Sequence, residues 1–210
     1  MRIAIGALLI LGLATLTAGP IRAQSKSTER LGTVRFATSC APAVQPKFDR
    51  AVALLHSFHL DAAVGAFTEV AGADPSCGMA YWGTAMAWLG NPLAAPPNAR
   101  GMKEGSAAVE KAKTAGAKTD REREYIAAVE IFYKDADRLD HRTRAVAYER
   151  AMEQIAARYP TDREAAVFYA LALNITLDPT TRPTPTSSRR PGSSKKCLPS
   201  SPIIPAWPTT

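Results

Sequence analysis

The sequence predicts an all-α fold: a right-handed α-α superhelix of stacked antiparallel helix pairs, followed by a disordered C-terminal tail. Apolar residues recur at three- and four-residue spacing through most of residues 44–176, which is the spacing of one helix face. Ala51 and Leu54 return 34 positions later as Ala85 and Trp88, so the helical units repeat. Prolines separate successive pairs. We therefore expect a solenoid in which neighbouring pairs share one hydrophobic core.

The first 23 residues have the features of a secretory signal peptide. Arg2 precedes an apolar run of about 14 residues, which is shorter than the roughly 20 residues that a transmembrane helix needs. Gly19 and Pro20 break this run, and Ala23 supplies the small residue expected at a cleavage point. We expect cleavage after Ala23, a periplasmic or secreted protein, and no stable membrane span. An uncleaved membrane anchor is the alternative.

Residues 24–43 predict an extended N-terminal segment that carries the first of three cysteines. An oxidising compartment favours a disulfide between Cys40, near the end of this segment, and Cys77, at the start of a predicted helix. Such a bond would tie the segment to the second helical unit and would stabilise the fold by about 4 kcal/mol in the chain-entropy model. A reactive free thiol at Cys77 and a metal site are the competing interpretations.

The first helix pair and the helix after it have the clearest apolar patterns. Residues 46–58 form a wide apolar stripe, which predicts the first helix. Residues 61–73 predict its partner, with Asp61 as the expected N-cap and Pro75 just beyond its end. Residues 77–89 are apolar almost all round, so we expect this helix to be buried on both sides.

Four more helices are expected in the second half of the array. Residues 99–115 contain few large apolar residues and several glycines, which predicts a helix of low intrinsic stability. Narrow apolar seams over residues 125–139 and 145–159 predict two helices that pair with each other. Residues 162–173 predict the first helix of a further pair.

Residues 44–176 resemble a tetratricopeptide repeat array of the bacterial exported kind. The small, aromatic and proline positions of that family match Ala51, Ala63, Phe67, Pro75, Tyr81, Ala85 and Trp88. The chain departs from the family pattern at Lys47, Arg50 and Tyr148 and in a long insertion at residues 91–99.

The resemblance implies that the inner helices line an apolar concave groove for a protein or peptide partner. It would place in this groove Phe48, Val52, Leu55, His56, Trp82, Met86 and Leu89. Family members that clamp a C-terminal carboxylate use a lysine and an asparagine where this chain has Phe48 and Val52. The expected ligand is therefore an apolar peptide or an amphipathic helix. The alternative interpretation of the same stripe is core between repeats.

The sequence predicts an interaction scaffold and not an enzyme. It contains no nucleophile elbow, phosphate-binding glycine loop or metalloprotease motif, and no cofactor is expected. The net charge of +7 comes largely from the two ends of the chain, whereas residues 24–177 are nearly neutral. This distribution argues against nucleic acid as a partner. The rival hypothesis is a small-molecule or metal carrier that uses the aromatic groove with His56 and His59.

Residues 177–210 predict a disordered tail. They hold half of the chain's 16 prolines, many Ser and Thr residues and almost no periodic apolar residues. The predicted helix over residues 162–173 is left without the partner helix expected next. We infer from this break that the tail arose from a shifted reading frame, and a genuine proline-rich tail is the alternative.

Overall fold

The computed structural model describes residues 31–177, and all regular structure in this range is helical. The all-α class predicted from the sequence is therefore confirmed. The predicted signal peptide at residues 1–23 and the predicted tail from residue 178 onward lie outside the described residues. The elements in the described range are η1 (Pro42–Val44), α1 (Gln45–His56), α2 (Leu60–Ala73), α3 (Gly78–Leu89), α4 (Ala99–Ala115), α5 (Asp120–Tyr133), α6 (His141–Arg158) and α7 (Arg163–Thr176).

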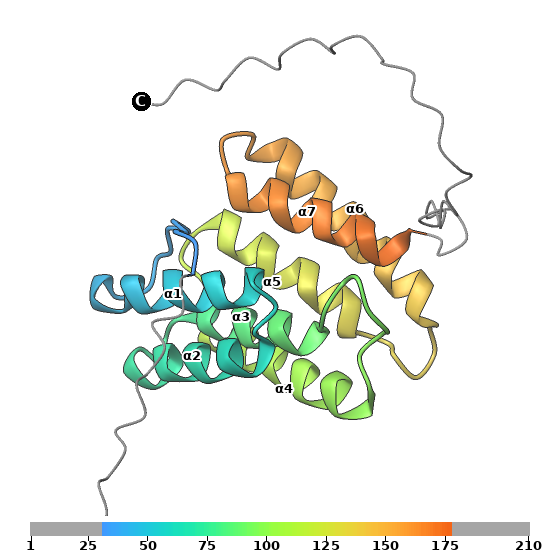
Figure 1. Cartoon of the computed structure of the whole chain (residues 1–210), viewed down its shortest axis with the longest axis horizontal. Coiled ribbons are helices and arrows are strands. Elements are labelled where there is room, and N and C mark those ends of the chain that lie inside the picture. Colours follow the sequence, from blue (N-terminus) through green and yellow to red (C-terminus); the bar gives the residue numbers. More distant parts are fainter. Residues whose placement is uncertain (1–30, 178–210) are drawn as a thin grey trace, which may run out of the picture.

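Consecutive helices pack against one another along the chain, as in a solenoid. Helices α1 and α2, α3 and α4, and α5 and α6 form three hairpins, and α7 packs against α6. Neighbouring hairpins meet through α2 with α3 and through α4 with α5. Figure 1 shows this order, from the blue end at α1 to the orange end at α7. Within residues 31–177 no helix has the length and apolar character needed to cross a membrane.

Side-chain caps explain where four of the helices begin. A backbone N–H in the first turn of α4, α5, α6 and α7 donates to the N-cap side chain of Asn98, Thr119, Asp140 and Asp162, respectively. The prediction of Asp61 as the cap of α2 is wrong. The N-cap is His59, which makes no side-chain cap bond. Asp61 lies in the first turn, where its negative charge interacts favourably with the helix dipole.

The apolar seam predicted over residues 125–139 is longer than the helix that forms there. Helix α5 ends at Tyr133, because Lys134 is extended and Asp135 adopts a left-handed backbone conformation with φ of 52°. Leu139 consequently remains 43% exposed and does not join the core. In α6 the core positions of the predicted seam are all buried, and they are Ala145, Tyr148, Met152 and Ile155.

The glycines of α4 permit a close approach between helices. A Cβ atom added to Gly105 would lie 2.2 Å from the Cζ atom of Tyr133 on α5. The Tyr133 hydroxyl donates a 2.8 Å hydrogen bond to the carbonyl of Ala85 on α3. Glycine at this position therefore lowers the helix propensity of α4 but makes room for a ring that links three helices.

Candidate functional site

The first helices of the pairs form one layer, and this layer surrounds Phe36 with aromatic rings. Helix α1 contacts α3, and α3 contacts α5. One aromatic residue from the first half of each of α1, α3, α5 and α7 lies with its ring centroid 5.2–6.4 Å from that of Phe36. Phe36 itself is fully buried, although it belongs to a segment without helix or strand. The four surrounding residues, here called the aromatic cage, are Phe48, Trp82, Tyr125 and Phe168.

The N-terminal segment, defined here as residues 31–41, is held through its main chain. Four of its backbone N–H groups donate to side-chain oxygens that belong to α1, to the end of α2 and to α5. These bonds run from Phe36 to Asp49 Oδ1 at 3.1 Å, from Thr38 to Gln45 Oε1 at 3.0 Å, from Ser39 to Glu122 Oε1, and from Ala41 to Asp74 Oδ2 at 2.8 Å. The helices thus satisfy backbone groups that a sheet partner would satisfy in a β-strand.

Arg121, in the first turn of α5, contacts both a ring and the main chain of the segment. Its guanidinium carbon lies 4.5 Å from the centroid of Phe36, and its Nη1 donates a 2.9 Å hydrogen bond to the carbonyl of Ala37. Its Nε donates to Asp162 Oδ2 at 2.6 Å, and the Tyr125 hydroxyl donates to the same oxygen at 3.0 Å. Burial opposes the charge of Asp162, but the hydrogen bond and charge of Arg121 outweigh it and lower the pKa of Asp162. This ion pair fixes the guanidinium over Phe36.

Two hydroxyl side chains of the segment are also bound. The Thr38 hydroxyl donates at 2.9 Å to Gln45 Oε1, the oxygen that accepts the Thr38 N–H. Gln45 Nε2 in turn donates to the carbonyl of Phe36 at 2.9 Å. Ser39 donates to Glu122 twice, through its N–H and through its hydroxyl. Glu122 is only 1% exposed, so its carboxylate relies on these donors in place of water.

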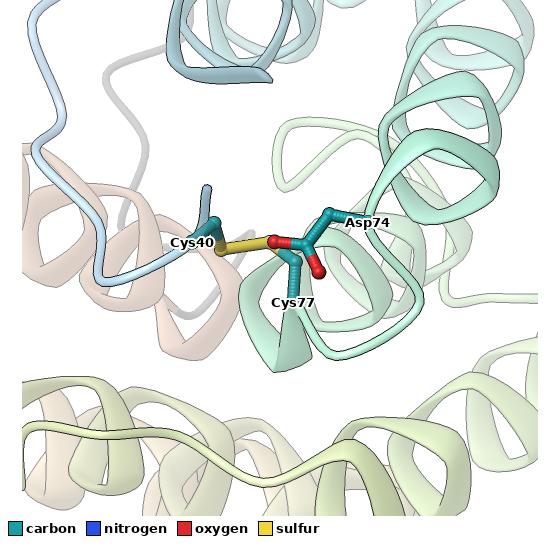
Figure 2. Close-up of side chains that lie close together, drawn as sticks. All are labelled: Cys40, Asp74 and Cys77. Atoms are coloured by element: carbon teal, nitrogen blue, oxygen red, sulfur yellow. A yellow bond between two sulfur atoms is a disulfide. The ribbon is translucent and has the colours of Figure 1, made fainter. Parts of the chain in front are cut away.

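The predicted disulfide between Cys40 and Cys77 is confirmed. The sulfur atoms are 2.01 Å apart and the Cα atoms are 4.9 Å apart. Figure 2 shows this bond beside the carboxylate of Asp74. That carboxylate accepts hydrogen bonds from Ala41 and then Ser76, which are the main causes of the lowered pKa of Asp74. The disulfide and Asp74 therefore fix the end of the N-terminal segment where the helices begin.

Three of the predicted groove residues lie in the core and do not form an open surface. Phe48 and Val52 are 0% exposed, and Trp82 is 1% exposed. The physical reason is the N-terminal segment: the ring of Phe36 packs against the rings of Phe48 and Trp82 at 5.7 Å and 5.5 Å. The space that the resemblance assigned to a partner is therefore filled by the chain itself.

The other apolar groove residues line a small cavity further along the same layer. Leu55, Met86 and Leu89 are 6–7% exposed and face side chains of α7. The cavity between them has a volume of about 20 Å³, which holds little more than one water molecule. Phe168 lines this cavity and also belongs to the aromatic cage, so the two sites are neighbours.

His56, which was expected to share a ligand site with His59, contacts a carboxylate of another helix. Its Nε2 is 2.6 Å from Glu164 Oε2, so it joins the end of α1 to the start of α7. His59 occupies the N-cap position of α2 without a side-chain cap bond. Neither histidine belongs to a group of three potential metal ligands in the described part of the chain. The one such group found in residues 31–177 comprises Cys40, Asp74 and Cys77. Its two sulfur atoms are bonded to each other and are not free to coordinate a metal.

Comparisons with protein-family models, with curated proteins and with solved structures gave no match for this chain. The resemblance to tetratricopeptide repeats therefore stays a prediction. The fold and the site define a class by geometry: a helical array that packs an irregular N-terminal segment against the layer formed by α1, α3, α5 and α7.

The aromatic cage has a sequence signal that apolar periodicity alone does not reveal. Phe48 and Trp82 are 34 positions apart, and Trp82, Tyr125 and Phe168 follow at intervals of 43 positions. One aromatic residue thus recurs in the first helix of each hairpin and in α7. Phe36 has no such signal, because it is one aromatic residue in a segment without periodicity.

Proposed function

We propose that this chain is an exported helical scaffold whose inner layer binds an extended polypeptide segment. The main support is the capture of four backbone N–H groups of residues 31–41 by side chains of the helices. Contacts of this kind recognise an extended main chain, as strand addition to a sheet edge does. The aromatic cage adds a pocket for one large ring. Export is supported by the Cys40–Cys77 disulfide and by the predicted signal peptide.

Binding in trans can be tested with the full mature chain carrying Phe36→Ala, Thr38→Ala and Ser39→Ala together, here called the triple variant, which empties the aromatic cage and removes the segment's own hydroxyl contacts to Gln45 and Glu122. The probe is a fluorescein-labelled peptide of residues 31–39, which contains no cysteine. We expect this peptide to bind the triple variant at least about tenfold more tightly than the wild-type chain, whose cage and hydroxyl acceptors are already filled. Fluorescence polarisation measures both affinities.

Thr33→Ala is the matched control, because Thr33 belongs to the same segment but is exposed. It should bind the peptide no better than the wild-type chain does. Absence of binding to the triple variant at millimolar peptide, with helical circular dichroism retained, would mean that the segment is only a part of the core and that the proposed function is wrong.

A carrier function is the second candidate, and one cavity favours it. This cavity, of about 280 Å³, lies between the loop after α3, the start of α6 and the end of α7. His141 and Arg142 are its charged or titratable lining residues. Native mass spectrometry that shows a stoichiometric small ligand would support the carrier function, and a mass equal to the chain alone would count against it.

A further inference from the structure

We infer that the inner layer selects an extended segment with the pattern Phe-x-Thr-Ser, and that the partner of this scaffold presents such a segment. The inference rests on the proposed function and names the chemical class of the partner. Its basis is that residues 36–39 are bound position by position, with separate contacts for the ring, for two carbonyls and for two hydroxyl groups.

The first position selects a ring. Phe36 is enclosed by four aromatic side chains, and the Arg121 guanidinium covers it at 4.5 Å. Edge-to-face ring contacts and a cation over a ring face both require an aromatic side chain. Leucine would fill part of this volume but would make neither interaction.

The second position is open to most residues. Ala37 is exposed, and the contact that holds it is the hydrogen bond from Arg121 Nη1 to its carbonyl oxygen. Because every residue has this carbonyl, the contact fixes the direction of the main chain without selecting a side chain.

The third position selects a hydroxyl donor. Gln45 Oε1 accepts from both the N–H and the hydroxyl of Thr38. The amide of Gln45 cannot rotate to offer its nitrogen instead, since Nε2 already donates to the carbonyl of Phe36 and to Asp49 Oδ1, at 2.9 Å and 2.8 Å. Valine has the shape of threonine but no donor, so it would leave this oxygen with one hydrogen bond fewer.

The fourth position has the strictest requirement. Glu122 is buried, and its two carboxylate oxygens accept separately from the N–H and the hydroxyl of Ser39. The Ser39 oxygen also accepts from the N–H of Lys118 at 3.4 Å. Alanine would leave one oxygen of a buried carboxylate without its donor. Aspartate or phosphoserine would place a second negative charge beside Glu122 and would be rejected.

The test is a competition series on the triple variant, whose own segment no longer offers the ring or either hydroxyl, with unlabelled peptides of residues 31–39. Because a hydrogen bond to a charged group carries a large share of the affinity, Ser39→Ala in the peptide should weaken binding at least about tenfold. Phe36→Leu should weaken it about tenfold, and Thr38→Val about three- to tenfold. The matched control is Ala37→Val, which changes the open position and should alter affinity less than about twofold.

The outcomes distinguish a failure of the proposed motif from a failure of the proposed function. Equal binding of the parent, Ser39→Ala and Phe36→Leu peptides overturns the motif and leaves the proposed function standing. If no peptide binds, both fail.

A second measurement does not depend on the folding of the triple variant. In the otherwise wild-type chain, Ser39→Ala should lower hydrogen-exchange protection of the Phe36 amide about tenfold, because local opening of the segment becomes easier. Ala37→Val should leave this protection unchanged. Unchanged protection in Ser39→Ala overturns the role of Glu122 in selecting serine.

Discussion

Replacing Phe36 by alanine measures how much the N-terminal segment contributes to the stability of the helical array. The ring is 0% exposed and touches the aromatic cage together with Arg121. Full burial of a phenylalanine side chain is worth about 1.5–3 kcal/mol in transfer free energy. A cavity adds to this loss where the surroundings cannot collapse, and core Phe→Ala changes lower the free energy of unfolding by about 3–5 kcal/mol in total.

We expect a value near 3–4 kcal/mol for Phe36→Ala, because two effects oppose each other. The cage residues sit on four helices that are each fixed by a packed neighbour, so the space left by the ring cannot close well. The segment itself has no helix or strand, however, so it can adjust more readily than the helices do. A domain of ordinary stability, about 5–15 kcal/mol, remains folded after such a loss.

Urea unfolding followed by circular dichroism, with the disulfide intact, provides the assay. The midpoint should fall with little change in slope, because the surface exposed on unfolding is nearly the same. The exposed control Thr33→Ala should change the free energy of unfolding by less than about 0.5 kcal/mol. A loss below about 1 kcal/mol in Phe36→Ala would refute the view that this ring belongs to the cooperative core.

Two further predictions concern packing and charge. Gly105→Ala should lower the free energy of unfolding by about 1–3 kcal/mol, since its Cβ would meet Tyr133 at 2.2 Å. Gly65→Ala, where nothing lies within 4 Å, should raise it by about 0.5–1 kcal/mol, and the opposite order of melting temperatures would contradict the packing argument. Because the folded-state pKa of Asp162 is lowered, its contribution to stability is present above the ordinary aspartate pKa of about 3.9 and is lost as the pH falls further. Asp162→Asn should therefore be less stable at neutral pH and should lose less stability between about pH 4 and pH 2, whereas parallel pH profiles of urea midpoints would argue against this ion pair.

Local pattern predicted most of the helices, because each helix carries enough apolar periodicity to be recognised alone. The predicted helix over residues 99–115 coincides with α4, and the one over residues 77–89 differs from α3 by one residue. Errors occurred where backbone geometry overruled pattern. The seam continues past Tyr133, but the left-handed conformation of Asp135 ends α5 before the pattern does.

The candidate site was less predictable, because it depends on what covers an apolar face. The pattern placed Phe48 and Trp82 on such a face correctly, yet nothing in their spacing indicates that Phe36 lies on top of them. Glu122 illustrates the same limit for charge. Glu122 lies in a run of alternating acidic and basic residues, and such a run predicts a solvated helix face. In the folded chain, however, Ser39 covers the Glu122 carboxylate.

The position of Phe36 has a consequence for the order in which the chain matures. Its environment is complete only after Phe168, about 130 residues later, has been synthesised and docked. On the proposed export with the N-terminus first, this hydrophobic ring stays exposed in the new compartment until the other end of the chain arrives. Contacts between such distant parts of a sequence form slowly. The earliest part of this polypeptide to emerge is thus among the last to reach its native place.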